Sequence, residues 1–155
     1  MSLREDMQAA VTGGDLDAID ALAAEHPRAV RYLVGLMYRS DDGVRRIGAR
    51  GIALAARHHP RVVKKIIERL LWAMNVESNT YAPAAPEVLL AIAEETPELL
   101  VPVVSDLVRL SKDAHLSQGL GDTLRRIAER CPGEVGRELT RSLNRHAGPS
   151  GRGCR

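Results

Sequence analysis

A short segment ending in proline occurs four times along the 155-residue chain and defines an internal repeat. The prolines stand at positions 27, 60, 97 and 132, which are 33, 37 and 35 residues apart, and an alanine stands four positions before each of them. Repeats of this length indicate stacked units, because a single unit cannot bury its apolar face alone. We therefore expect a repeat architecture.

Residues with the same offset from the four prolines are apolar in most columns. The columns contain Ile19, Ile52, Leu89 and Leu124; Ala23, Ala56, Ala93 and Ala128; Val30, Val63, Leu100 and Val135; Val34, Ile67, Val104 and Leu139; and Tyr38, Leu71, Val108 and Leu143. The last three columns follow the proline by three, seven and eleven residues, which is the spacing of one helix face. We expect these columns to build the core.

The intervals between prolines are long enough for two helices joined by a polar turn, and no segment shows the period of two that strands require. We expect the prolines to begin helices, and Thr96 to cap the helix after it. The sequence predicts an all-α fold of about nine helices, at 2–12, 15–26, 28–39, 42–58, 61–75, 85–96, 98–112, 116–131 and 134–146. The helical domain then covers 1–146, and 147–155 is a disordered, basic, Gly-rich tail.

Residues 39–54 resemble the second helix of a HEAT repeat, whose pattern is D-x-x-V-R-x-x-A-x-x-A-L. Asp41 or Asp42 stands at the acidic turn position of that pattern. Val44 stands at its core position and Arg45 at its arginine.

Residues 97–107 are similar to the first helix of such a repeat, and Pro102 matches the internal proline that bends it. The resemblance to HEAT-repeat proteins, including small bacterial members, implies a short right-handed α-α superhelix. It also implies that the second helix of each pair lines a concave surface that faces a partner. These second helices are expected at 42–58, 85–96 and 116–131.

The composition is that of an ordinary globular protein, with 45% hydrophobic and 27% charged residues. No apolar run approaches the roughly 20 residues that span a bilayer, and the N-terminus is too polar for a signal peptide. The two cysteines, Cys131 and Cys154, are too few for a disulfide framework. We expect a cytoplasmic protein without membrane association.

Charge is unevenly distributed along the chain. Residues 41–75 carry eight Lys or Arg and three acids, whereas residues 76–124 carry two Lys or Arg and eight acids. Such bands can steer an oppositely charged partner, although solvated helix faces also produce them. Nucleic acid is not an expected partner, because the net charge is only +2 and 3% of the residues are aromatic.

Arg46, Arg50 and Arg57 share one stripe of the predicted helix 42–58. The HEAT resemblance places this stripe on the concave surface, where guanidinium groups can bind carboxylates or phosphates through paired hydrogen bonds. The next predicted helix adds further cations at Arg61, Lys64, Lys65 and Arg69.

Trp72 lies on the polar face of the predicted helix 61–75. A tryptophan there is either covered by a neighbouring segment or available as an anchor for a partner. The long turn after it is similar to a W-x-x-N-x-E-S…A-P-E segment of small bacterial HEAT-like proteins, and it is either a binding loop or a rigid connection. The candidate partner-binding residues are Trp72, Asn75, Glu77, Tyr81 and Glu87, with Arg46 and Arg50 as neighbours.

The sequence offers no convincing catalytic or metal-binding set. His58 and His59 are adjacent, so on a helix their side chains point about 100° apart, and two ligands do not make a zinc site. We predict no catalytic residue, metal or cofactor.

The predicted function is that of a non-enzymatic scaffold, adaptor or assembly factor that binds a protein or peptide. Two alternatives come from other HEAT-like families, the bilin lyases that handle a chromophore and the alkyl-base DNA glycosylases. The acidic segment 76–124 argues against the continuous cationic channel that a glycosylase needs. The sequence leaves the oligomeric state open.

Overall fold

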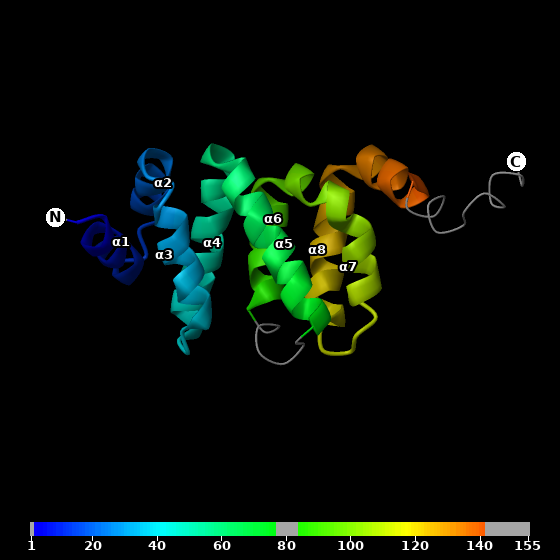
Figure 1. Ribbon diagram of the computed structural model, residues 1–155, viewed down its shortest axis with the longest axis horizontal. Helices are drawn as coiled ribbons and strands as arrows, with labels where there is room; N and C mark the ends of the chain where they lie inside the picture. Colours follow the sequence, from blue (N-terminus) through cyan, green and yellow to red (C-terminus); the bar gives the residue numbers. More distant parts are fainter. Residues whose placement is uncertain (1, 77–83, 142–155) are drawn as a thin grey trace, which may run out of the picture.

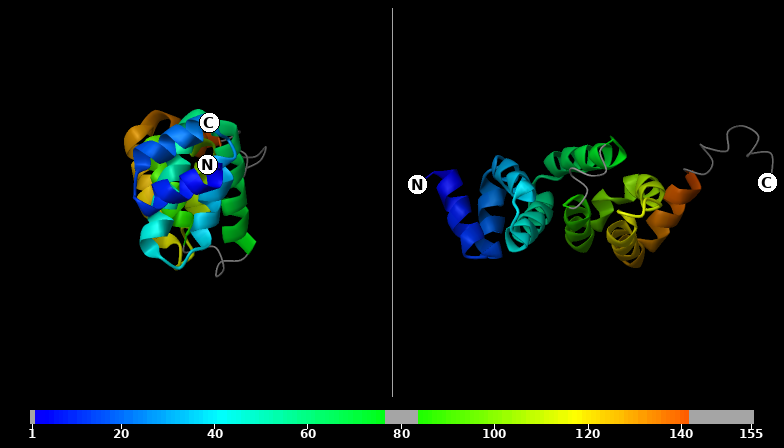
Figure 2. Two further views of the ribbon diagram at one scale, coloured as in Figure 1. Left: turned by 90° about the vertical axis from the view of Figure 1, so that its left-hand side faces the viewer. Right: turned by 90° about the horizontal axis from the view of Figure 1, so that it is seen from below.

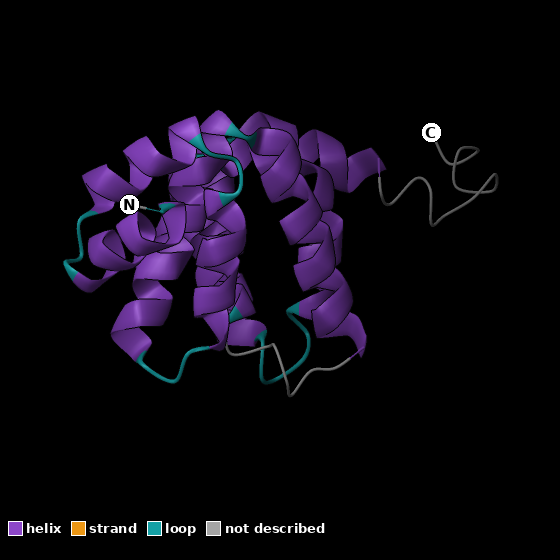
Figure 3. Cartoon of the chain, turned by 60° about the vertical axis from the view of Figure 1, so that its left-hand side comes forward, coloured by secondary structure: helices purple, strands orange, loops and turns teal. Residues whose placement is uncertain are grey.

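The computed structural model describes residues 2–76 and 84–141, and the regular elements within these ranges are all helical (Figures 1 and 3). The α-helices are α1 (Leu3–Thr12), α2 (Leu16–Glu25), α3 (Ala29–Gly35), α4 (Asp42–His58), α5 (Pro60–Val76), α6 (Ala85–Glu95), α7 (Val104–Leu110) and α8 (Ser117–Arg130), followed by a helical segment at 132–141. Three short 3-10 helices are η1 (Leu36–Tyr38), η2 (Pro97–Leu99) and η3 (Val101–Val103). The predicted all-α class is confirmed. The predicted tail at 147–155 lies outside the described residues.

Short polar side chains begin three of the helices. The side chains of Ser2, Asp15 and Asp41 accept hydrogen bonds from backbone N–H groups three residues later, at 3.2, 3.1 and 3.1 Å. Each bond satisfies a donor that the helix itself leaves without a partner. Asp41 thereby fixes the start of α4, whose bounds agree with the prediction.

The four repeated prolines do not all begin an α-helix. Pro60 is the first residue of α5, and position 132 likewise begins the last helical segment. Pro27 instead lies in a turn, and α3 begins two residues later at Ala29. Pro97 begins a 3-10 helix, so the expectation of an α-helix at each proline is only partly correct.

The single helix predicted at 98–112 is wrong in its first half. Pro97 and Pro102 both lack the N–H that an α-helical ladder needs, and the chain forms η2 and η3 before α7 begins at Val104. Thr96 does not cap this segment as predicted: its Oγ1 is buried without a hydrogen bond among the described residues. Its backbone carbonyl accepts from the Leu99 N–H at 3.1 Å.

The helices are stacked along the long axis in two layers (Figures 1 and 2). Helices α2, α4, α6 and α8 form one layer in which each contacts the next. In the other layer α1 contacts α3 and α5 contacts α7, whereas α3 and α5 approach each other less closely. Successive pairs thus bury a continuous core between the layers.

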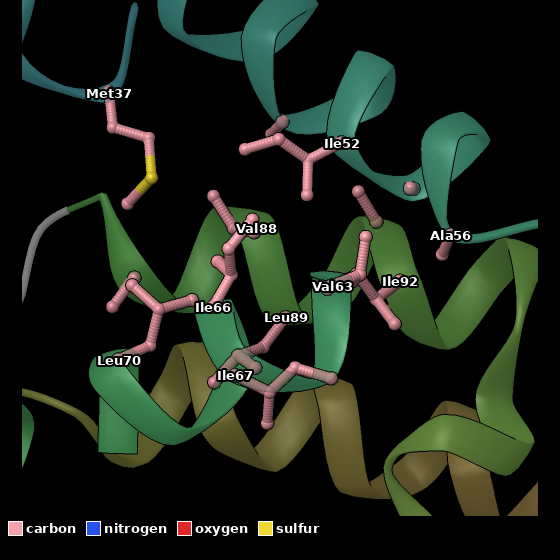
Figure 4. Packing of buried hydrophobic residues seen from close by; sticks show 14 of the residues in the cluster. Met37, Ile52, Ala56, Val63, Ile66, Ile67, Leu70, Val88, Leu89 and Ile92 are labelled. Carbon is pink, nitrogen blue, oxygen red and sulfur yellow. The ribbon is translucent and has the colours of Figure 1, made fainter. Parts of the chain in front are cut away.

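The middle of the core lies where α5 packs across α4 and α6 (Figure 4). Val63, Ile66 and Ile67 of α5 face Val88, Leu89 and Ile92 of α6, with Ile52 of α4 beside them. All seven are buried, as the repeat columns predict for Ile52, Val63, Ile67 and Leu89.

Some column residues lie outside the core, and their positions explain why. Leu124 is half-buried and Ala128 is exposed, because α8 is the last member of its layer. Tyr38 is 64% exposed since α3 ends at Gly35 and the tighter 3-10 turn that follows changes the helical period. Val108, 38% exposed, is displaced in the same way by the 3-10 helices before α7.

Alanine substitutions at two glycines of α8 should change the free energy of unfolding in opposite directions. A Cβ at Gly119 would lie 2.5 Å from the Cβ of Pro86 on α6, whereas a Cβ at Gly121 would meet nothing within 4 Å. Alanine favours a helix over glycine by about 1 kcal/mol, but overpacking costs about 1–3 kcal/mol. We therefore expect Gly119→Ala to lower the free energy of unfolding by up to about 2 kcal/mol and Gly121→Ala to raise it by about 0.5–1 kcal/mol. Urea titrations followed by circular dichroism measure both, and an equal response would contradict close α6–α8 packing.

Candidate functional site

Trp72 lies on the outer face of α5 and is 64% exposed. Together with Lys65, Glu68 and Arg69 it lines a shallow surface pocket. Asn75 follows on the same helix, where its Oδ1 accepts a hydrogen bond from Nη1 of Arg109 at 3.2 Å. Asn75 therefore ties α5 to α7, and Trp72 has most of its ring available for contact.

The other predicted site residues do not join Trp72 on one surface. Glu77 and Tyr81 lie outside the described residues, and Glu87 is half-buried in the first turn of α6. Arg46 and Arg50 are exposed on α4.

Arg57 shows which face of α4 carries the arginine stripe. Its guanidinium pairs with Asp20 of α2 at 3.2 Å and with Glu95 of α6 at 4.0 Å. The stripe therefore lies on the outer face of the α2–α4–α6–α8 layer, whereas Trp72 lies on the outer face of the other layer. The structure separates Arg46 and Arg50 from Trp72, so the predicted patch falls on two opposite sides of the molecule.

A groove of about 440 Å³ lies between α3, with the turn before it, and α5. Its cations are Arg28 and Arg31 on one side and Arg61, Lys65 and Arg69 on the other, and its apolar residues are Pro27, Val30, Val34, Val62 and Ile66. Among the residues that the structure describes, no carboxylate lines it. We call this surface the cationic groove; it exists because α3 and α5 are the more widely separated neighbours of their layer.

The five cations of the cationic groove have no hydrogen-bond or ion-pair partner within the part of the chain that the structure describes. All five are exposed, so the charges are solvated in the free protein. Among the described arginines outside the groove, six form ion pairs with acids, as in Arg109 with Asp106 at 2.9 Å and Arg125 with Asp122 at 3.0 Å. Five unpaired like charges over an apolar floor can bind an anionic group that also carries apolar surface.

The groove continues at both ends. Lys65 and Arg69 also line the pocket of Trp72, so the groove leads directly to that ring. Arg31 also lines a hollow between α1, α3 and the start of α4, which includes Arg4 and Arg39.

Sequence reasoning identified the α5 cations but missed Arg28 and Arg31. Residues 1–40 carry six acids and four arginines, so the segment is acidic on average. Two of its arginines are nevertheless only three residues apart. That spacing places both on one side of the predicted helix 28–39, and it was the available signal.

The two histidines make structural contacts between helices. Nε2 of His58 lies 2.8 Å from Oδ1 of Asp20, and Nε2 of His59 lies 2.7 Å from the carbonyl oxygen of Ala23. His58 lies at the surface, where it pairs with Asp20. Both contacts join the end of α4 to α2.

Burial raises the pKa of the Cys131 thiol, and a hydrogen bond to the nearby Glu134 carboxylate raises that pKa further. Since the thiolate is the reactive form, this cysteine is a weak nucleophile at neutral pH. No group of three or more His, Cys, Asp or Glu residues within 2–76 and 84–141 is placed to hold a metal ion.

Comparison of the chain with protein-family models, curated proteins and solved structures finds no match. Among the described residues, no helix combines the length and the apolar character needed to cross a bilayer.

Proposed function

We propose that the protein is a non-enzymatic binding module, a short HEAT-like right-handed superhelix that holds a segment of another protein in the cationic groove. The observation that carries this proposal is the groove itself, with five exposed, unpaired cations above apolar residues. Arginine and aromatic residues are enriched at protein–protein interfaces, and a tryptophan is a frequent anchor of such interfaces. Trp72 stands at the end of this groove.

Within this proposal, the partner-facing layer contains α3 and α5. On the opposite face, the guanidinium of Arg57 is paired with Asp20 and Glu95 of the protein itself. Arg46 and Arg50 lie exposed on that opposite face and have no role in this proposal. The roles predicted for Asn75 and Glu87 are, in this proposal, structural.

Site-specific photo-crosslinking tests the proposal. A photoreactive phenylalanine replaces Val62, which lines the groove and is 38% exposed, or Ala21, an exposed residue of α2 in the other layer. We expect one discrete crosslinked protein segment from position 62 in native lysate and none from position 21. Equal crosslinking from both positions, or none from either, would contradict a binding site in the groove.

A further inference from the structure

We infer that the occupant of the cationic groove is an amphipathic helix of a partner protein that carries Glu or Asp at every third or fourth position. This inference rests on the proposed function and gives the chemistry of its partner. The spacing of the cations, their presence on both walls and the apolar floor between them lead to it.

The cations of α5 form a regular row. Arg61, Lys65 and Arg69 follow one another at intervals of four residues, which is about 6 Å along a helix. Trp72 shares their face of α5. The row from Arg61 to Trp72 therefore extends over about 16 Å, and a second helix aligned with α5 presents residues four apart with the same period.

The opposite wall supplies a second set of cations. Arg28 and Arg31 lie across the groove from the α5 row, so an acidic side chain inserted between the walls meets positive charge on both sides. Four of the five cations are arginines, whose guanidinium groups bind carboxylates through two parallel hydrogen bonds.

The apolar floor of the cationic groove favours an occupant with apolar side chains. Val34 is half-buried and Val62 is 38% exposed, so part of the floor remains in contact with water in the free protein. The apolar stripe of an amphipathic helix would cover this surface, with Trp72 as the anchor at one end. A nucleic acid contacts a cationic surface mainly through its phosphates and has no aliphatic side chains to cover this floor, which favours a protein helix.

The chain does not supply this helix from its remaining segments. Residues 1, 77–83 and 142–155 contain Glu77 as their one acidic residue. A second copy could present acids such as Glu94 and Glu98, which are exposed. Self-association is therefore a measured outcome of the test.

The test uses a fluorescein-labelled 16-residue peptide with Glu at every fourth position, Leu on the adjoining face and Ala elsewhere. Fluorescence anisotropy compares it with a scrambled peptide of the same composition and with labelled oligothymidine of 16 nucleotides. The groove variant is Arg31→Glu with Arg69→Glu. The matched control is Arg46→Glu with Arg50→Glu, which changes the net charge equally on the other layer.

We expect saturable binding of the helical peptide, at least tenfold weaker binding by the groove variant, and less than a twofold change in the control. Equal affinity for the scrambled peptide would overturn the inference that the acids recur along an amphipathic helix. Tighter binding of oligothymidine would overturn the inference that the partner is a protein. Dimerisation in sedimentation experiments that excludes the peptide would identify a second copy as the occupant. Circular dichroism checks that both variants fold.

The crosslinking experiment separates the two levels of the proposal. Position-specific crosslinking from residue 62 without peptide binding would reject the acidic helix and leave the binding module in place. Failure of both experiments would reject the binding module as well.

Discussion

Replacing Leu89 by alanine should lower the free energy of unfolding by about 2–5 kcal/mol. Leu89 is fully buried in α6, where it packs beside Val88 and Ile92 against α5 (Figure 4). Removing the isopropyl end of its side chain leaves a cavity that the surrounding helices cannot close. Because α6 contacts both α4 and α8, the defect weakens the stack in both directions. The loss is a large fraction of the roughly 5–15 kcal/mol typical of a domain.

The adjacent Leu90 is the matched control for this prediction. It has the same side chain on the same helix but is only half-buried. Urea titrations of Leu89→Ala and Leu90→Ala, followed by helical circular dichroism, should give a loss for Leu90→Ala of less than about half that for Leu89→Ala. Equal losses would contradict the packing of α6 between the layers.

Reversing the row of cations on α5 should reverse the charge preference of the groove. The variant combines Arg61→Glu, Lys65→Glu and Arg69→Glu, and the second peptide replaces each Glu of the helical probe by Lys. We expect the natural protein to bind the Glu peptide at least tenfold more tightly than the Lys peptide, and the variant to show the opposite order. Glutamates of the variant and glutamates of the peptide repel each other, whereas groups of opposite charge attract and form hydrogen bonds.

A net-charge effect would give a different result. The variant Arg46→Glu with Arg50→Glu also lowers the net charge, but on the opposite side of the molecule. It should keep the preference for the Glu peptide at physiological salt, where charges farther apart than about 8 Å are largely screened. A preference that follows net charge in both variants would contradict a localised site.

The sequence allowed helix ends to be predicted closely at some caps and prolines, but not at Pro27, after which α3 begins two residues later. Asp41 begins α4 and Pro60 begins α5 as the local chemistry indicates. The helix predicted at 98–112 is wrong in its first half, where an apolar helical pattern coincides with two prolines. Pro97 and Pro102 together prevent a regular α-helix there. The prediction that Ala128 is buried was wrong, because a residue of a repeat column is covered only when another helix follows in the same layer.

The candidate site was harder to predict than the helices. Arg46 and Arg50 are exposed on α4, and the HEAT resemblance already assigned the helix of Trp72 to the other layer, yet the candidate patch combined residues of both helices. The groove depends on the distance between α3 and α5, whose cations Arg31 and Arg69 are far apart in the sequence. Such a distance is set by the packing of α5 onto α4 and α6 and has no signature in either segment alone.

Nuclear magnetic resonance of the isotope-labelled protein with the helical Glu peptide tests the cationic groove most directly. The account predicts saturable chemical-shift changes that cluster on α3, on the outer face of α5 and at the indole N–H of Trp72, with α2 and α8 unaffected. Changes centred on Arg46 and Arg50, or spread evenly over both layers, would contradict it.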